Sequence, residues 1–99
     1  GIAAPPADAL AGGDAKFNAE VVSDLFAGVS TPKLDAVSDA VCLNAAAALT
    51  AVDAVTSEVS SVNASLAHNF EKARAAITSG AAQNTLQRWV ESTHSIARD

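Results

Sequence analysis

The segment from Asp39 to Leu49 constrains the fold of this chain more than any other part. It reads Asp-Ala-Val-Cys-Leu-Asn, then four alanines, Ala45 to Ala48, and a leucine. Alanine has the highest intrinsic helix propensity, so four in succession strongly favour helix. Its small side chain also leaves a smooth surface against which another helix can lie close. The segment therefore predicts a tightly packed helix with no obvious reacting group.

Two helices are expected in the first half of the chain. Asp14 as N-cap and Gly28 as the left-handed C′ residue delimit a helix over about residues 15–27. Thr31 as cap and Pro32 in the first helical position begin a second helix. Its buried stripe is predicted at helical spacing and comprises Leu34, Val37, Val41, Ala45, Ala48, Leu49 and Val52. Residues 53–61 are expected to form a loop, although Asp53-Ala-Val could prolong the helix.

The second half predicts two more helices. One covers about residues 62–78 and presents Val62, Leu66, Phe70, Ala73 and Ile77 on one face. Gly80 separates it from a helix over about residues 82–95, which presents Leu86, Trp89 and Val90. No window alternates cleanly enough to predict a strand. The fold class is therefore all-α with about four helices, divided into an extended arm (1–13), a helical body (14–95) and a frayed tail (96–99).

Composition narrows the function classes. The net charge of −5 and the scattered basic residues argue against nucleic acid as a partner. The longest uncharged apolar run, from Ala40 to Val52, is too short to span a bilayer, so no membrane role is expected. The single cysteine, Cys42, fits a reducing compartment, and we expect a cytoplasmic protein. Because the chain starts at Gly1 and contains no methionine, we also expect a fragment of a longer protein.

Several residues invite a chemical interpretation that their surroundings do not support. Gly12-Gly13-Asp14 resembles a phosphate-binding helix start, but Asp14 would fill the free amides itself, so a plain cap is favoured. His68 with Glu71 and His94 with Glu91 provide two ligands each, fewer than a metal site needs. Cys42 lacks a basic neighbour within a helical turn, so we predict a small buried packing group. No catalytic, cofactor-binding or metal-binding residue is assigned.

Three further features also invite a chemical interpretation: an acidic pair, a tryptophan and a sequon. Asp35 and Asp39 lie four residues apart and could bind a cation, but both fall in the first two turns of a helix, where the dipole favours acidic residues. Trp89 beside Arg88 could stack on a ligand or anchor a partner. Its helical spacing from Leu86 instead favours a place in the core. Asn63-Ala-Ser65 matches a glycosylation sequon, which carries no weight without a secretion signal.

The ordered motifs resemble one enzyme family. Three motifs, in this order, are similar to the C-terminal part of anthranilate phosphoribosyltransferase. They are Gly-Gly-Asp14 with Asn18-Ala19, Asp39-Ala-Val-x-Leu-Asn44-Ala-Ala-Ala-Ala-Leu49, and Ser79-Gly80-Ala81-Ala82. The resemblance covers about residues 10–90. It departs at residues 32–41, where one helical turn is duplicated and Leu34 or Ser38 stands in place of an expected arginine.

The resemblance implies a function for the longer protein. The family joins anthranilate to 5-phosphoribosyl 1-pyrophosphate in tryptophan biosynthesis, uses Mg²⁺, and has a small helical domain and a larger α/β domain. Its catalytic motifs come earlier than the matched part, and none is recognisable here. The chain would thus be a catalytically incomplete structural portion that packs on the α/β domain. It would bind no Mg²⁺ itself, and its partner would be the N-terminal remainder of the same polypeptide.

Two other functions remain open from the sequence. The chain could be a free-standing helical interaction module that self-associates through its apolar helix faces. A related pyrimidine-nucleoside phosphorylase is the third possibility, and the Leu43-Asn44-Ala45-Ala46 helix argues against it.

Overall fold

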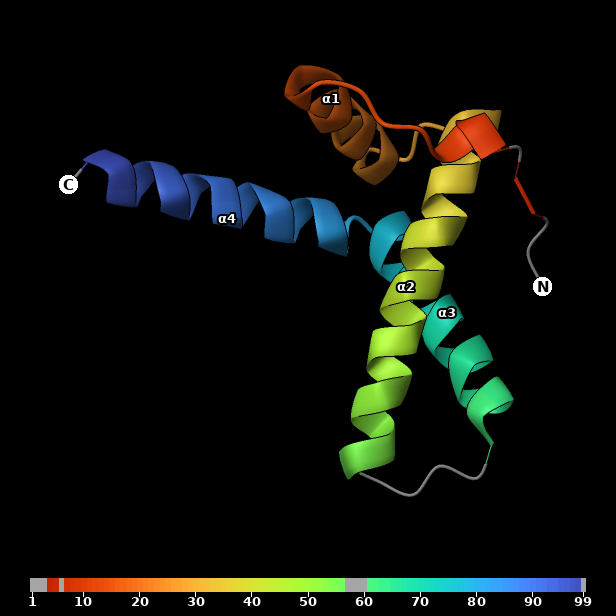
Figure 1. Ribbon diagram of the computed structural model, residues 1–99. Helices are drawn as coiled ribbons and strands as arrows, with labels where there is room; N and C mark the ends of the chain where they lie inside the picture. The colour runs from red at the N-terminus through yellow and green to blue at the C-terminus, as the bar shows by residue number, and fades with distance from the viewer. Residues whose placement is uncertain (1–3, 6, 57–60, 99) are drawn as a thin grey trace.

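The computed structural model describes residues 4–5, 7–56 and 61–98, and within these ranges the chain is helical and contains no strand (Figure 1). A short 3-10 helix, η1 (Ala7–Leu10), precedes four α-helices. The all-α prediction with four helices is confirmed. The helices are α1 (Ala15–Phe26), α2 (Pro32–Thr56), α3 (Val62–Thr78) and α4 (Ala81–Arg98).

The boundaries of α1 follow from its capping residues, as predicted. Asp14 Oδ1 accepts a hydrogen bond of 2.8 Å from the Phe17 amide, which satisfies one of the free donors of the first turn. At the other end Gly28 adopts a φ of +83°. The Val29 amide then donates to the Asp24 carbonyl and the Gly28 amide to the Leu25 carbonyl, the two bonds of a Schellman motif.

Helix α2 begins as expected and ends later. Thr31 Oγ1 accepts from the Leu34 amide at 3.1 Å, and Pro32 occupies the first helical position. The helix continues without interruption through residues 35–38, where the resemblance implies an extra turn. It also includes residues 53–56, so the alternative that Asp53-Ala-Val prolongs the helix is confirmed and the loop expected there is wrong for those four residues. The rest of that loop before Ser61 lies outside the described residues.

The main tertiary contact is the packing of α3 along α2 (Figure 1). The buried row of α2 differs from the predicted stripe. The stripe is only partly covered, with Val41 40% exposed and Val52 56% exposed. Within the predicted stripe, burial of Leu34 is confirmed. The other buried residues of α2 lie outside the stripe, are spaced by four, and are smaller or more polar: Cys42, Ala46 and Thr50. Small side chains in this row let α3 approach closely, and the larger apolar face stays open.

Helix α3 has the predicted bounds, and Ser61 caps it by accepting from the Ala64 amide at 3.3 Å. Its predicted face is half-buried except for Val62, which is 61% exposed. The fully buried position is Asn69, a polar residue that the periodicity did not select. Its side chain reaches Thr50 on α2, which explains why burial is tolerated there.

Helix α4 leaves the other three helices and projects as an arm (Figure 1). It follows Gly80, whose φ is +84°, and runs from Ala81 to Arg98, three residues past the predicted end. Residues 87–97 are all exposed. The molecule is consequently open, with a radius of gyration of 15.6 Å, compared with about 13 Å for a compact domain of this size.

Helix α2 corrects one expectation about membranes. Among the described residues it is long and apolar enough, by length and composition alone, to cross a bilayer. The uncharged run at residues 40–52 is shorter than a membrane span, but the helix extends beyond it in both directions. A single helix of this kind is weak evidence, since core helices of water-soluble proteins and signal sequences pass the same test.

Candidate functional site: an apolar groove

The angle between the four helices holds two adjoining hollows. The first has a volume of about 490 Å³ and lies over α2 and α3. Its lining is almost entirely apolar and consists of Phe26, Val41, Cys42, Ala45, Ala48, Leu49, Lys72, Ala73, Ala76, Ile77 and Ala82. Much of the open face of α2 therefore forms the floor of a depression.

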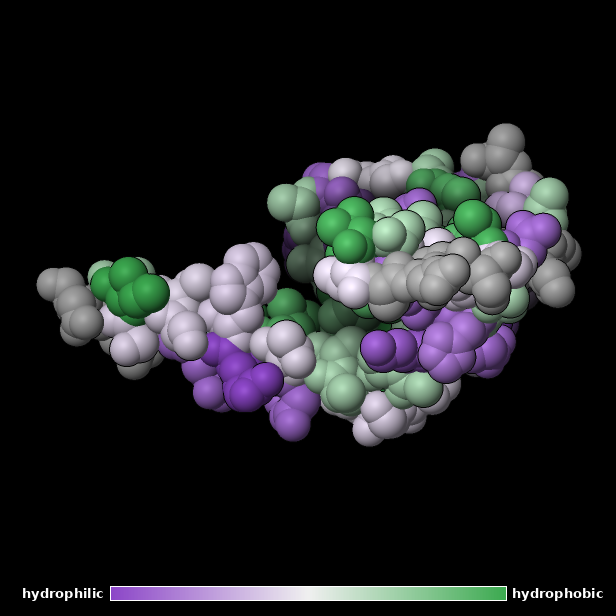
Figure 2. Space-filling model, turned by 90° about the horizontal axis from the view of Figure 1, so that it is seen from below, coloured by the Kyte–Doolittle hydropathy of each residue, from purple (hydrophilic) through white to green (hydrophobic). Residues whose placement is uncertain are grey.

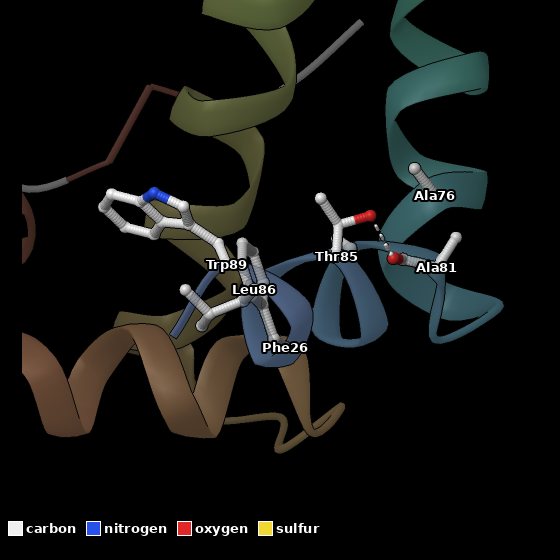
Figure 3. Close-up of a pocket in the computed structure, with 7 residues that line it drawn as sticks. Phe26, Ala76, Ala81, Thr85, Leu86 and Trp89 are labelled. Carbon is white, nitrogen blue, oxygen red and sulfur yellow. Dashed lines mark hydrogen bonds between the residues drawn. The ribbon is translucent and has the colours of Figure 1, made fainter. Parts of the chain in front are cut away.

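The second hollow, of about 440 Å³, lies at the base of α4 (Figure 3). It is lined by Phe26, Ala76, Ala81, Ala82, Thr85, Leu86 and Trp89. Phe26, Ala76 and Ala82 line both hollows, so the two join into one depression, called here the apolar groove. Figure 2 shows hydrophobic residues gathered in the angle where the projecting helix meets the body.

Local sequence explains why the groove is hollow. Five of the α2 and α3 positions that line it are alanine or cysteine, whose short side chains leave space between the helices: Cys42, Ala45, Ala48, Ala73 and Ala76. The left-handed turn at Gly80 then swings α4 away from α3 before its apolar side can cover them. Small residues and one turn thus leave the groove open.

The groove offers little for catalysis. Of its lining residues, all within the described part of the chain, Lys72 alone is charged, and Thr85 Oγ1 already donates to the Ala81 carbonyl at 3.0 Å. The Cys42 side chain is 1% exposed. Burial raises the pKa of the Cys42 thiol, and this outweighs the opposite effects of a hydrogen bond with Ser38 and of the Arg74 charge. The thiol therefore stays protonated and is a poor nucleophile.

Gly12-Gly13-Asp14 forms the cap that the sequence predicts. The Asp14 carboxylate accepts a hydrogen bond from the Phe17 amide. The Asn18 side chain accepts from the Gly13 amide and donates to the Gly13 carbonyl. These amides are therefore already used within the chain. The prediction of a buried, packing Cys42 is likewise confirmed.

The two histidines and the Asp35 and Asp39 pair, considered above as metal or cation ligands, do not form a shared site in the structure. His68 and His94 are both exposed, and no group of three or more His, Cys, Asp or Glu side chains suited to a metal occurs among the described residues. Asp35 accepts from the Ser30 hydroxyl at 2.9 Å, whereas Asp39 pairs with Arg74 at 3.4 Å. The two carboxylates are thus engaged by different partners.

Trp89 corrects the sequence interpretation. We expected it in the core, but it is 65% exposed and lines the groove at the base of α4 (Figure 3). Its helical spacing from Leu86 correctly identified one apolar side of the helix, but not whether anything covers that side. Phe26, which links the two hollows, was missed, because only the meeting of three helices gives it that place.

Comparison with known proteins identifies relatives for nearly the whole chain. A protein of Thermobifida fusca (strain YX) is 43% identical over 98 residues, which are 99% of this chain and 26% of the relative. A protein of Nocardioides sp. (strain ATCC BAA-499 / JS614) is 47% identical over 93 residues, which are 94% of this chain and 25% of the relative. A protein of Thermomicrobium roseum is 44% identical over 88 residues, which are 89% of this chain and 22% of the relative. No protein-family model and no solved structure matches the chain.

These relatives are phosphoribosyltransferases by name, so the chain is related to that class of glycosyl-transferring enzymes. More narrowly, each is an anthranilate phosphoribosyltransferase, and the chain corresponds to a segment of such a protein. It spans about a quarter of the length of the curated relatives it matches. This coverage agrees with the C-terminal portion expected from the motifs.

Proposed function

We propose that this chain is the C-terminal structural portion of an anthranilate phosphoribosyltransferase. The whole protein would join anthranilate to 5-phosphoribosyl 1-pyrophosphate in tryptophan biosynthesis, as a cytoplasmic enzyme. Mg²⁺ and both substrates would be held by the N-terminal remainder, and this chain would supply none of the catalytic groups. The similarity to relatives four times as long supports this division.

The observation that carries the proposal is the open apolar groove. Leu49, Ile77 and Leu86 line it while remaining partly exposed, and Trp89 is largely exposed. Exposed apolar area of this kind is unfavourable in water and typically marks a surface that another element covers. Since roughly three quarters of each relative lies outside the matched segment, we propose that the N-terminal remainder occupies the groove.

A second candidate function uses the exposed apolar side of α4 next to the groove. Val90 and Ile96 continue the apolar side of α4 beyond the groove and are 40% and 73% exposed. Two copies of the chain could bury these residues against each other. The chain would then be a free-standing oligomerisation module without catalysis.

A complementation experiment tests the first proposal. The pure chain is mixed with the Thermobifida fusca enzyme truncated before its matching segment, and anthranilate consumption is followed by fluorescence. We expect no turnover from either part alone, turnover from the mixture, and co-elution on size exclusion. Leu49→Arg, inside the groove, should abolish both signals. Val55→Arg, on the same helix but 87% exposed and outside the groove, should leave them unchanged.

The outcomes separate the two functions. Turnover by the 99-residue chain alone would refute the assignment of a non-catalytic portion. Failure of the parts to associate, together with a concentration-dependent dimer that Ile96→Arg disrupts, would favour the oligomerisation module instead.

A further inference from the structure

The segment before α1 is attached to the helices by more than its cap. The Gly13 amide donates to Asn18 Oδ1 at 2.9 Å, and Asn18 Nδ2 donates back to the Gly13 carbonyl at 3.0 Å. Both polar groups of one peptide residue are therefore paired with one side-chain amide. Asparagine is a poorer helix former than alanine, and this pair of hydrogen bonds accounts for its presence near the start of α1.

A second attachment reaches the same segment from α2. Lys33 Nζ donates to the Ala11 carbonyl at 3.2 Å and lies 5.3 Å from the centroid of the Phe17 ring. The ring in turn packs on Gly13, where a Cβ atom would approach Phe17 Cδ1 to 2.7 Å. Glycine is needed at this position because any side chain would displace the ring that Lys33 contacts.

We infer that Asn18 and Lys33 form a clamp that fixes residues 11–13 on α1 and α2 and so sets the direction in which the chain reaches the helical body. The clamp directs that segment toward the N-terminal end of α2, where η1 also lies (Figure 1). None of residues 8–13 lines the apolar groove. The clamp thus keeps this segment off the surface proposed to receive a partner.

The clamp needs nothing outside this chain, so it can be tested on the chain alone. Amide hydrogen exchange by NMR reports the Gly13 N–H directly. We expect this amide to be protected in the wild type and to exchange on the order of ten-fold faster in Asn18→Ala, the change produced by losing one hydrogen bond. Alanine would otherwise strengthen α1, so weakening of the helix cannot produce this acceleration.

Three variants make the test specific. Asn18→Asp retains the acceptor for the Gly13 amide but not the donor to its carbonyl, so protection of that amide should persist. Lys33→Met removes the ammonium but keeps a long apolar stem, and should speed exchange of the Ala11 amide, which donates to the Asp8 carbonyl. Asn84→Ala, at an exposed asparagine on α4, is the matched control and should change neither amide.

The clamp is refuted if the wild-type Gly13 amide exchanges at the rate of an unstructured peptide. Equal exchange in wild type and Asn18→Ala, with the α2 and α3 amides still protected, would refute it as well. Should Asn18→Ala fail to fold, Lys33→Met decides, because unchanged exchange at Ala11 would remove the second attachment.

Discussion

Asn69 Nδ2 lies 3.1 Å from Thr50 Oγ1 between α3 and α2, the two helices that make the main tertiary contact. The same nitrogen donates to Asp53 Oδ2, also at 3.1 Å. Asn69 is 2% exposed and Thr50 is 8% exposed, so water is largely excluded from their bond. Sliding α3 by one turn would leave the amide buried without these acceptors. The pair therefore sets the register of the two helices.

Asn69→Ala should lower the free energy of unfolding by about 1–3 kcal/mol, because the Thr50 hydroxyl loses its buried partner. Urea denaturation followed by circular dichroism measures the change. Asn84→Ala, at an exposed site on α4, should change stability by less than about 0.5 kcal/mol. Equal effects of the two substitutions would show that the Asn69 pair contributes nothing to the helix register.

Leu49→Ala should cost about 1–2 kcal/mol in the isolated chain, less than the roughly 2–5 kcal/mol of a fully buried leucine. The reason is that Leu49 is only half-buried in the floor of the groove. Val55→Ala, at an 87% exposed site on the same helix, is the control and should be nearly neutral. A loss above about 3 kcal/mol at Leu49 would indicate that the groove is closed in solution.

Cys42 should make the chain less stable at alkaline pH. Its pKa is raised in the folded state, chiefly by burial, so the unfolded chain releases the thiol proton first. The stabilising contribution is complete below the unfolded pKa of about 8.5 and is lost as the pH rises toward the folded value. Urea titrations at pH 7 and pH 10 should show a fall in stability that Cys42→Ala reduces. An identical pH dependence in that variant would contradict the assignment.

Gly80→Ala should destabilise the turn between α3 and α4 by about 1–2 kcal/mol, because φ is +84° there and a Cβ atom is strained in that region. A Cβ would meet no atom within 4 Å, so crowding adds nothing. Gly80→Asn should cost less, since asparagine tolerates the left-handed conformation. Thermal unfolding compares the two variants, and equal losses would exclude the backbone explanation.

Helix ends proved readable from local residues. Asp14 and Thr31 each accept a hydrogen bond from an amide of the following turn, and Gly28 and Gly80 adopt positive φ, at the ends that the sequence predicts. Ser61 caps α3 in the same way, although it was not predicted as a cap. These interactions join residues a few positions apart, so the local sequence contains both partners. The late end of α2 was harder to predict, because residues 53–56 are helical beside a tertiary contact between Asp53 and Asn69.

The candidate site was less accessible to sequence reasoning. The apolar positions of α2 were identified, but Val41 and Leu49 were expected in the core and line an open groove instead. Trp89 was likewise placed in the core and lies exposed beside that groove. Periodicity shows which residues share a helix face, but not what lies opposite it.

By itself, the sequence determined the four helices, the N-caps of α1 and α2 and the relationship to anthranilate phosphoribosyltransferases, because these depend on local hydrogen bonding and on motif order. Only the tertiary structure decided which side of α2 is buried. There α3 packs on the row of Cys42, Ala46 and Thr50. The physical reason is that small side chains permit close approach while Thr50 satisfies the buried Asn69, and this leaves the larger apolar residues free to form the groove.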